Sequence, residues 1–352
     1  MVVDYQTHWY PPAYLDSIRG RSADPRTEIV EGGYLYEGPN DDQRVLDRRF
    51  FDLEPHLADM DEHGIDVMVC SPNLVGEVTL LPLAEARETA QLLNEETARA
   101  QRELADRFVG LAMLPMQDAD AAIEALEHAV LRLGLSGVCI LSHIAGRPIA
   151  SAATLPIYRR IAELGVPVFL HPANRSSAYH AGEVRPIENG LNWMVDTSRA
   201  ALSLMLTGTL DACPGLAVVH PHTGGVLPYV ISRIAATARP TVTTVETPPT
   251  MERSPAQYLH ERFYADTVNP TAGALALAIS AYGLERILLA TDYPWQPRGP
   301  RLADVHANAD AAAVQAIFHE NVPSGLRLPG SPERPPTVQA PTVVRCGAAH
   351  PR

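Results

Sequence analysis

The chain has few of the features that mark disulfide-rich, secreted or membrane proteins. Its 4 cysteines (Cys70, Cys139, Cys213 and Cys346) are scattered, with no Cys-x-x-Cys pair and no framework spacing. Buried free thiols in a reducing compartment fit this pattern. No stretch approaches the roughly 18 apolar residues of a membrane span, and no basic region followed by a long apolar run opens the sequence as in a signal peptide. We therefore predict a soluble cytoplasmic protein with no membrane partner.

Positive charge is also scarce. The formal net charge is -13 and the pI is near 5.4. Nucleic-acid binding needs a basic surface that neutralises phosphates, so nucleic acid is not an expected partner. A small anionic substrate is compatible with this charge, because local arginines can outweigh the overall field at short range.

Four apolar runs are each followed at once by a side chain that can bind a metal or transfer a proton. Uninterrupted apolar runs are typical of buried parallel strands. Four such strands that deliver polar groups at one face indicate a (β/α)8 barrel with its active site at the C-terminal ends of the strands. The runs are Val2–His8, Val166–Pro172, Leu216–His222 and Arg286–Pro294.

The rest of the chain alternates strand and helix patterns. Four more strands are expected, at Asp66–Cys70, Phe108–Leu114, Gly137–Leu141 and Arg262–Val268. Apolar residues spaced three and four apart predict the helices between them: Leu53–His63, Ala84–Asp106, Ala119–Leu133, Leu155–Leu164, Ser198–Ala212, Val226–Ala238, Thr271–Tyr282 and Ala303–Phe318. Eight repeats favour closure into an α/β TIM barrel. No Gly-rich phosphate turn follows the first strand, which argues against a dinucleotide-binding fold.

The prediction is a single catalytic barrel domain over residues 1–328. The stretch 20–49, rich in Gly, Asp, Arg and Pro, follows the first strand, so we expect an insertion that acts as a lid over the active site. The Pro-rich tail, residues 329–352, is predicted to be disordered.

The strand ends carry a candidate metal site. Gln6 and His8 share one face of the first strand because side chains alternate along a strand. With His171 and Asp292 they offer two imidazoles, a carboxylate and an amide oxygen, which could hold a divalent metal and leave a position open. His222 precedes two glycines that allow close backbone approach, and a histidine suits proton transfer near neutral pH.

These residues resemble a known family. The chain is similar to the metal-dependent amidohydrolase superfamily, and within it to aminocarboxymuconate semialdehyde decarboxylase and the related aromatic acid decarboxylases. The resemblance covers about Val2 to Leu328, and its matching motifs are Asp4-Tyr5-Gln6-Thr7-His8, Gly64-Ile65-Asp66-Val67, His171-Pro172, Asp211-Ala212-Cys213-Pro214-Gly215-Leu216, His222-Thr223-Gly224-Gly225 and Thr291-Asp292-Tyr293-Pro294.

The resemblance implies a barrel of the metal-dependent hydrolase type, with one divalent ion held by His8, His171 and Asp292. Zinc is the expected ion, with manganese as the alternative. His222 is implied as an acid or base, with Asp292 as a second catalytic group. Arg44 and Arg233 are implied as clamps for a substrate carboxylate, Arg233 reaching in from the other subunit of a homodimer. Trp193 is expected to line an aromatic-friendly pocket.

One position departs from the family pattern. The family usually has His-x-His or Glu-x-His at the first strand, and this chain has Gln6 in the first of those places. Glutamine is a neutral and weak oxygen ligand, so the metal would be held less tightly yet polarise a bound oxygen more strongly.

The sequence therefore predicts a metal-dependent, non-oxidative decarboxylase, a carbon–carbon lyase acting on a small unsaturated or aromatic carboxylic acid. A metal-dependent hydrolase or hydratase acting on a lactone, ester or enol acid is the first alternative. Because no lysine stands on any candidate strand, a bridged two-metal site is not expected. A repurposed, metal-poor barrel, a cyclase or isomerase, is the second alternative, and Gln6 is its main support.

Overall fold

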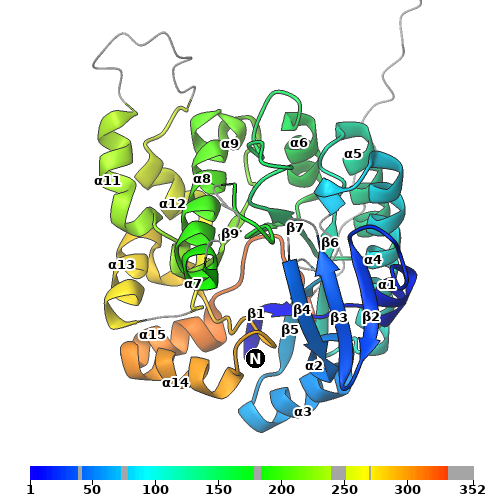
Figure 1. The fold of residues 1–352 in the computed structure, drawn as a ribbon. Helices are drawn as coiled ribbons and strands as arrows, with labels where there is room; N and C mark the ends of the chain where they lie inside the picture. The colour runs from blue at the N-terminus through cyan, green and yellow to red at the C-terminus, as the bar shows by residue number, and fades with distance from the viewer. Residues whose placement is uncertain (39–41, 73–77, 178–183, 239–250, 269–270, 332–352) are drawn as a thin grey trace, which may run out of the picture.

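The computed structural model describes residues 1–38, 42–72, 78–177, 184–238, 251–268 and 271–331. Eight parallel strands stand side by side in chain order, with helices packed around them (Figure 1). The predicted (β/α)8 barrel is confirmed. Its strands are β1 (Val3–His8), β5 (Val67–Ser71), β6 (Phe108–Met113), β7 (Gly137–Leu141), β8 (Val168–His171), β9 (Val218–His220), β10 (Phe263–Asp266) and β11 (Ile287–Leu288).

The barrel closes where the first strand meets the chain after the last one. Tyr5 N donates to Leu289 O at 2.9 Å and His8 N donates to Tyr293 O at 2.8 Å. Within the strand predicted over 286–294, the regular part is β11, and the chain leaves the strand direction at Asp292, which has φ of 63°. A strand cannot continue through that conformation.

The outer helices follow the predicted order. The bounds predicted at Leu53–His63 and Leu155–Leu164 are the observed ones, and the other bounds are shifted. The helices are α3 (Leu53–His63), α4 (Leu83–Glu103), α5 (Ala119–Glu127), α6 (Leu155–Leu164), α8 (Trp193–Leu206), α9 (Thr209–Ala212), α11 (Leu227–Thr237), α13 (Ala272–Tyr282), α14 (Arg298–Asn308) and α15 (Ala311–Gln315). The helix predicted over 303–318 is divided, because the Asp310 side chain accepts a hydrogen bond from Ala313 N and caps a new helix. Sequence reasoning missed α12 (Pro255–Arg262), which Ser254 and Gln257 start with a capping box.

The predicted insertion contains an antiparallel sheet of three strands, β2 (Arg26–Val30), β3 (Gly33–Gly38) and β4 (Asp42–Asp47). Thr27, Tyr36 and Arg44 face one another across this sheet and are buried. The sheet therefore has an inner face, and Arg44 lies on it. The predicted disordered tail lies outside the described residues from residue 332 onward.

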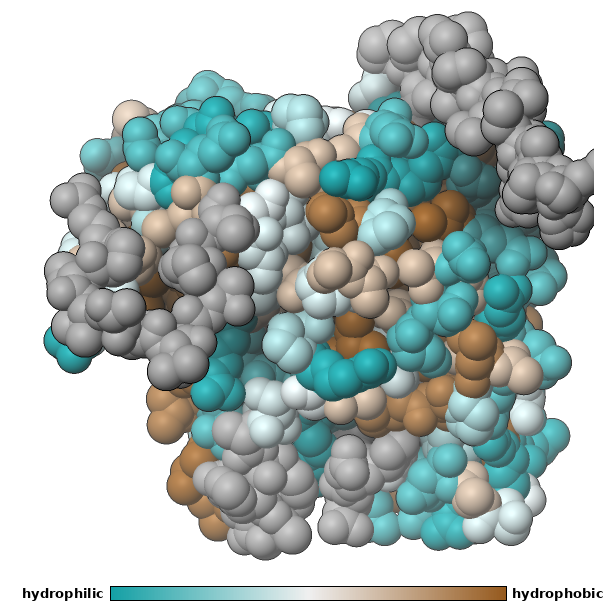
Figure 2. Space-filling model, turned by 90° about the horizontal axis from the view of Figure 1, so that it is seen from above, coloured by the Kyte–Doolittle hydropathy of each residue, from teal (hydrophilic) through white to brown (hydrophobic). Residues whose placement is uncertain are grey.

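The surface seen from above carries hydrophobic residues in small separate areas among hydrophilic ones, where residues are described (Figure 2). Within the described ranges, no helix is long and apolar enough to cross a bilayer.

Candidate active site

Three side chains from distant parts of the chain meet at the C-terminal mouth of the barrel. His8 ends β1, His171 ends β8, and Asp292 follows β11. One ligand atom from each lies within 4.8 Å of the others, and the two imidazole rings lie 5.0 Å apart at a steep angle. The structure thus brings together the three residues that were predicted to share a cation.

Backbone carbonyls fix the protonation of both imidazoles. Nδ1 of His8 lies 3.3 Å from Ser71 O, and Nδ1 of His171 lies 2.9 Å from Pro172 O. A carbonyl oxygen can only accept a hydrogen bond, so each Nδ1 carries the hydrogen and each Nε2 of the neutral ring keeps its lone pair. Both lone pairs are then available to the site.

This donor set fits a divalent cation. Nε2 of His8 lies 2.9 Å from Oδ1 of Asp292. With a neutral imidazole this places two acceptors in contact, an arrangement that becomes favourable when a cation or a proton lies between them. Burial, and then the neighbouring His8 and His222, hold the pKa of His171 well below its usual range. A neutral imidazole is the form that ligates metals.

Gln6 lies beside these donors with its amide nitrogen toward them. Nε2 of Gln6 is 3.4 Å from Asp292 Oδ1 and 3.4 Å from His222 Nε2. The sequence predicted a fourth ligand through the amide oxygen. In this structure the amide nitrogen faces the carboxylate. The ligand role of Gln6 stays a prediction.

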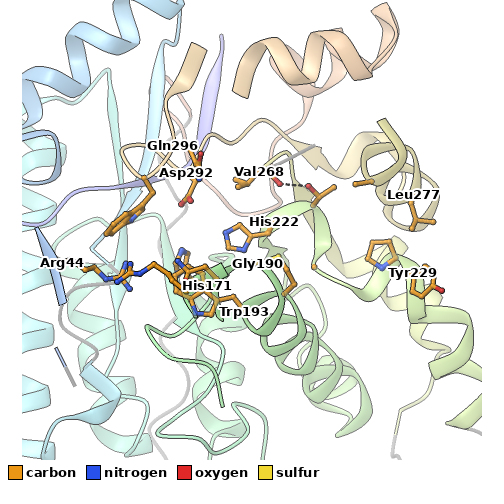
Figure 3. A pocket seen from close by; sticks show the side chains of 18 residues that line it. Arg44, His171, Gly190, Trp193, His222, Tyr229, Val268, Leu277, Asp292 and Gln296 are labelled. Atoms are coloured by element: carbon orange, nitrogen blue, oxygen red, sulfur yellow. Dashed lines mark hydrogen bonds between the residues drawn. The ribbon is translucent and has the colours of Figure 1, made fainter. Parts of the chain in front are cut away.

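His222 stands on a strained turn that follows β9. His222 and Thr223 both have left-handed backbones, with φ of 56° and 58°, in the short helix α10 (Pro221–Gly224). Such conformations cost of order 1–3 kcal/mol each in residues other than glycine and persist only when neighbours hold them. The turn aims the His222 ring into the cavity (Figure 3).

Asp266, at the end of β10, holds this turn. Its Oδ1 accepts hydrogen bonds from Thr223 N at 3.1 Å and Val268 N at 3.0 Å, and the Thr223 hydroxyl donates to Val268 O at 2.7 Å. Burial raises the pKa of Asp266 to about 7. Burial also lowers the pKa of His222, and the negative charge of Asp292 acts in the opposite direction.

The glycine after Thr223 is required by close packing as well as by its backbone. Gly224 has φ of 78°, and a Cβ there would lie 2.7 Å from the Tyr282 ring. The Tyr282 hydroxyl in turn lies 2.8 Å from Nδ1 of the fully buried His220. His220 is therefore a packing residue under the turn.

A cavity of about 410 Å³ opens above the three donors. Arg44 comes from β4 in the inserted sheet, is only 7% exposed, and stacks its guanidinium 4.8 Å from the ring centre of Trp295. Trp193, at the start of α8, also lines the cavity, and its indole nitrogen has no hydrogen-bond partner among the described residues. The Arg44 side chain thus places a positive group beside the donors (Figure 3).

The predicted clamp Arg233 does not line this cavity. It is exposed on the outside of α11. The lining residues missed by sequence reasoning include the polar residues Arg185, Asn189 and Gln296. Gln296 stands only four residues after Asp292, a spacing that could have marked it, whereas Arg185 and Asn189 follow no strand directly.

The barrel and its converging donors define a candidate mononuclear metal enzyme. The amidohydrolase family model matches residues 3–321. The chain therefore belongs to the amidohydrolase family, as its motifs predicted.

Two curated relatives are decarboxylases. The chain is 30% identical to the 2-amino-3-carboxymuconate-6-semialdehyde decarboxylase of Dictyostelium discoideum, over 72% of this chain and 69% of the relative. It is 33% identical to the gamma-resorcylate decarboxylase of Rhizobium sp. strain MTP-10005, over 77% of this chain and 85% of the relative.

A solved structure is similar over most of the chain. It is a dihydroxybenzoic acid decarboxylase from Polaromonas sp. JS666, with bound manganese and the inhibitor 2-nitroresorcinol. The match has a TM-score of 0.72 at 25% identity and covers 90% of this chain and 94% of that one.

Proposed function

We propose that this protein is a metal-dependent, non-oxidative decarboxylase of a small aromatic or unsaturated carboxylic acid. The observation that carries the proposal is the meeting of two imidazole lone pairs and one carboxylate below a cavity that Arg44 lines. The curated relatives bear out the predicted class, a carboxy-lyase of this family.

Decarboxylation breaks the bond between the carboxylate carbon and the substrate carbon that bears it. Carbon dioxide is released, and the electron pair of the bond stays on the substrate carbon. A proton must be delivered to the same carbon. His222 projects into the cavity next to Asp292, and either group can carry this proton. Arg44 would hold a substrate oxygen through charge-assisted hydrogen bonds, and the Trp193 ring would line the substrate pocket.

His8, His171 and Asp292 would hold the ion. A divalent cation bound there would orient and polarise substrate oxygens. We propose zinc, because nitrogen donors bind zinc more tightly than manganese, and two of the three donors are imidazoles. Manganese, found in the Polaromonas structure, is the alternative.

We also propose that the protein is a cytoplasmic homodimer in which Arg233 from a second copy of the chain enters the site. The exposure of Arg233 supports this, since the side chain can meet a second molecule. Mixing an Arg233→Ala variant with a His222→Ala variant should regenerate activity, because a mixed dimer contains one intact site. Two inactive variants that stay inactive after unfolding and refolding together would contradict the shared site.

A panel of acids tests the activity itself: γ-resorcylate, 6-methylsalicylate and 2-amino-3-carboxymuconate-6-semialdehyde. We expect metal-loaded protein to release carbon dioxide from at least one of them, chelation to abolish the release, and zinc or manganese to restore it. A product heavier by one water would favour the hydrolase or hydratase instead. Metal that stays substoichiometric after reconstitution would favour the metal-poor barrel.

A further inference from the structure

We propose that Gln6 is a positioning residue and not a metal ligand: its amide NH2 group joins the carboxylate of Asp292 to the ring of His222. The inference rests on the proposed function, since it concerns how the proposed ligand set and the proposed proton carrier are held together.

The neighbours of Gln6 decide which way its amide faces. Asp292 Oδ1 lies 3.4 Å from the amide nitrogen, and this is the oxygen that also lies 2.9 Å from His8 Nε2. An ionised carboxylate can only accept hydrogen bonds, so it is satisfied by the NH2 side of the amide and repelled by the carbonyl side. Gln6 thus donates to the oxygen that would bind the ion.

The second hydrogen of the same NH2 group serves His222. The amide nitrogen lies 3.4 Å from His222 Nε2, so this ring nitrogen accepts and the neutral ring carries its hydrogen on Nδ1. Nδ1 of His222 is buried and has no hydrogen-bond partner among the described residues. The contact with Gln6 is therefore the polar contact that orients this ring within the described part of the chain.

Glutamine is suited to this double contact in a way that the family's usual residues are not. A glutamate at this position would have no hydrogen to give to Asp292 or to His222, and its charge would repel the carboxylate. A neutral histidine has one N–H and could serve one partner only. The amide supplies two hydrogens from one atom and adds no charge.

A cation bound there would be held by His8, His171 and Asp292 without Gln6. An amide rotated by half a turn would offer its oxygen to the ion, but it would forfeit both hydrogen bonds. Without that fourth ligand, an additional coordination position is left for substrate oxygens. Because both contacts are long, at 3.4 Å, we expect their loss to cost several-fold in turnover rather than to abolish it.

The test compares metal affinity with turnover in Gln6→Ala, with His171→Ala as the matched loss of a ligand. The zinc Kd of each purified protein is measured by competition with a chromogenic chelator, and kcat and KM are measured on the acid that the wild-type protein decarboxylates. We expect Gln6→Ala to raise the zinc Kd by at most about 10- to 100-fold, as loss of a contact to a ligand does, and by less than His171→Ala does. We expect kcat to fall about 5- to 20-fold with little change in KM.

A zinc Kd that rises as much in Gln6→Ala as in His171→Ala would overturn the inference, because Gln6 would then contribute to binding as a ligand does. An unchanged kcat in Gln6→Ala would overturn it as well, since nothing would then have been positioned. If His171→Ala keeps the zinc Kd of wild type, the proposed metal site fails instead. The three results separate the role of Gln6 from the proposed function.

Discussion

Two clusters of ionisable groups share strand β1 and differ in how their charges are balanced. The lower cluster consists of Asp4, Asp59 and Arg298. The Arg298 guanidinium is fully buried, lies 3.1 Å from Asp4 and 2.9 Å from Asp59, and stacks 4.0 Å from the ring centre of Tyr293. Thr291 completes the set by donating two hydrogen bonds to Asp4.

The mouth cluster consists of His8, His171, His222 and Asp292. Strand β1 carries Asp4 into the lower cluster and His8 into the mouth cluster. Arginine neutralises the carboxylates below, whereas no arginine or lysine bridges to Asp292 among the described ion pairs. A buried charge requires its counter-charge, whereas the facing lone pairs of the mouth cluster are suited to a cation between them.

If the mouth cluster serves catalysis, its residues must be needed for turnover. We expect His222→Ala to lower kcat by about 10² to 10⁴, because a positioned acid or base contributes that much. Metal content should stay at the wild-type level, measured by atomic emission on the purified variant. A His222→Ala protein with near-normal turnover would refute the role of this residue.

The lower cluster should respond in stability. We expect Arg298→Ala to destabilise the protein by about 3–5 kcal/mol, because it leaves Asp4 buried without its counter-charge. Urea unfolding measures this loss. Asp4→Asn/Arg298→Met should recover part of it, since the double variant buries no charge at this position. A double variant less stable than Arg298→Ala would show that the pair is not the source of the loss.

Asp266 differs from the carboxylates of both clusters. It is buried, and its hydrogen-bond partners are backbone N–H groups and not a positively charged side chain. We expect Asp266→Ala to release the left-handed turn and to lower kcat by up to about 10², with a smaller change in KM. Asp266→Asn keeps an oxygen that can accept from Thr223 N, so it should retain most of the activity. Equal losses in both variants would point to the charge of Asp266 in place of its hydrogen bonds.

The smallest expected effect comes from a single buried histidine near each region, which makes stability depend on pH. Burial lowers the pKa of His56, beside the lower cluster, and of His220, under the mouth, to about 3. Their usual pKa is near 6.5, so between these values the unfolded chain binds protons that the folded protein rejects. Stability is therefore complete above pH 6.5 and is lost as the pH falls toward 3, by about 2 kcal/mol for each histidine at pH 5.

Urea unfolding at pH 7.5 and pH 5 measures this difference. His56→Gln should reduce the difference, because glutamine can still donate to Arg49 O, the partner of His56 at 2.7 Å, and does not titrate. His260→Gln is the matched control, since His260 is exposed. A difference that His260→Gln reduces as much as His56→Gln does would refute the assignment.

The sequence predicted the strands well because a buried parallel strand is written in consecutive residues. The apolar runs and the residues that end them, His8 and His171, are local features. Asp292 was found by the same pattern. The pattern also occurs at Phe263-Tyr264-Ala265-Asp266, but Asp266 was not predicted as a site residue. The three-stranded inserted sheet was missed because glycines and charged residues dominate its stretch. No apolar run marks the strand that places Arg44 on the inner face of this sheet.

Other features of the site depend on contacts that no local pattern contains. The orientation of the Gln6 amide depends on Asp292 and His222, which stand 286 and 216 residues further along the chain. The left-handed backbone of His222 and Thr223 depends on Asp266 from the next strand. The two glycines that follow suggested an unusual turn, but they did not show which residues would bear the strain.

The seam of the barrel has a consequence for assembly of the protein. His8 and Asp292 come from the first and last strands, which meet only when the ring of strands is complete. A folding chain whose last strand has not yet docked has no place for the ion. An ion that binds the closed barrel and not the open one must stabilise the closed state in proportion to its concentration and affinity. Bound metal would thus stabilise the contact between β1 and the segment that follows β11. Removal of the metal would weaken the barrel first at that contact.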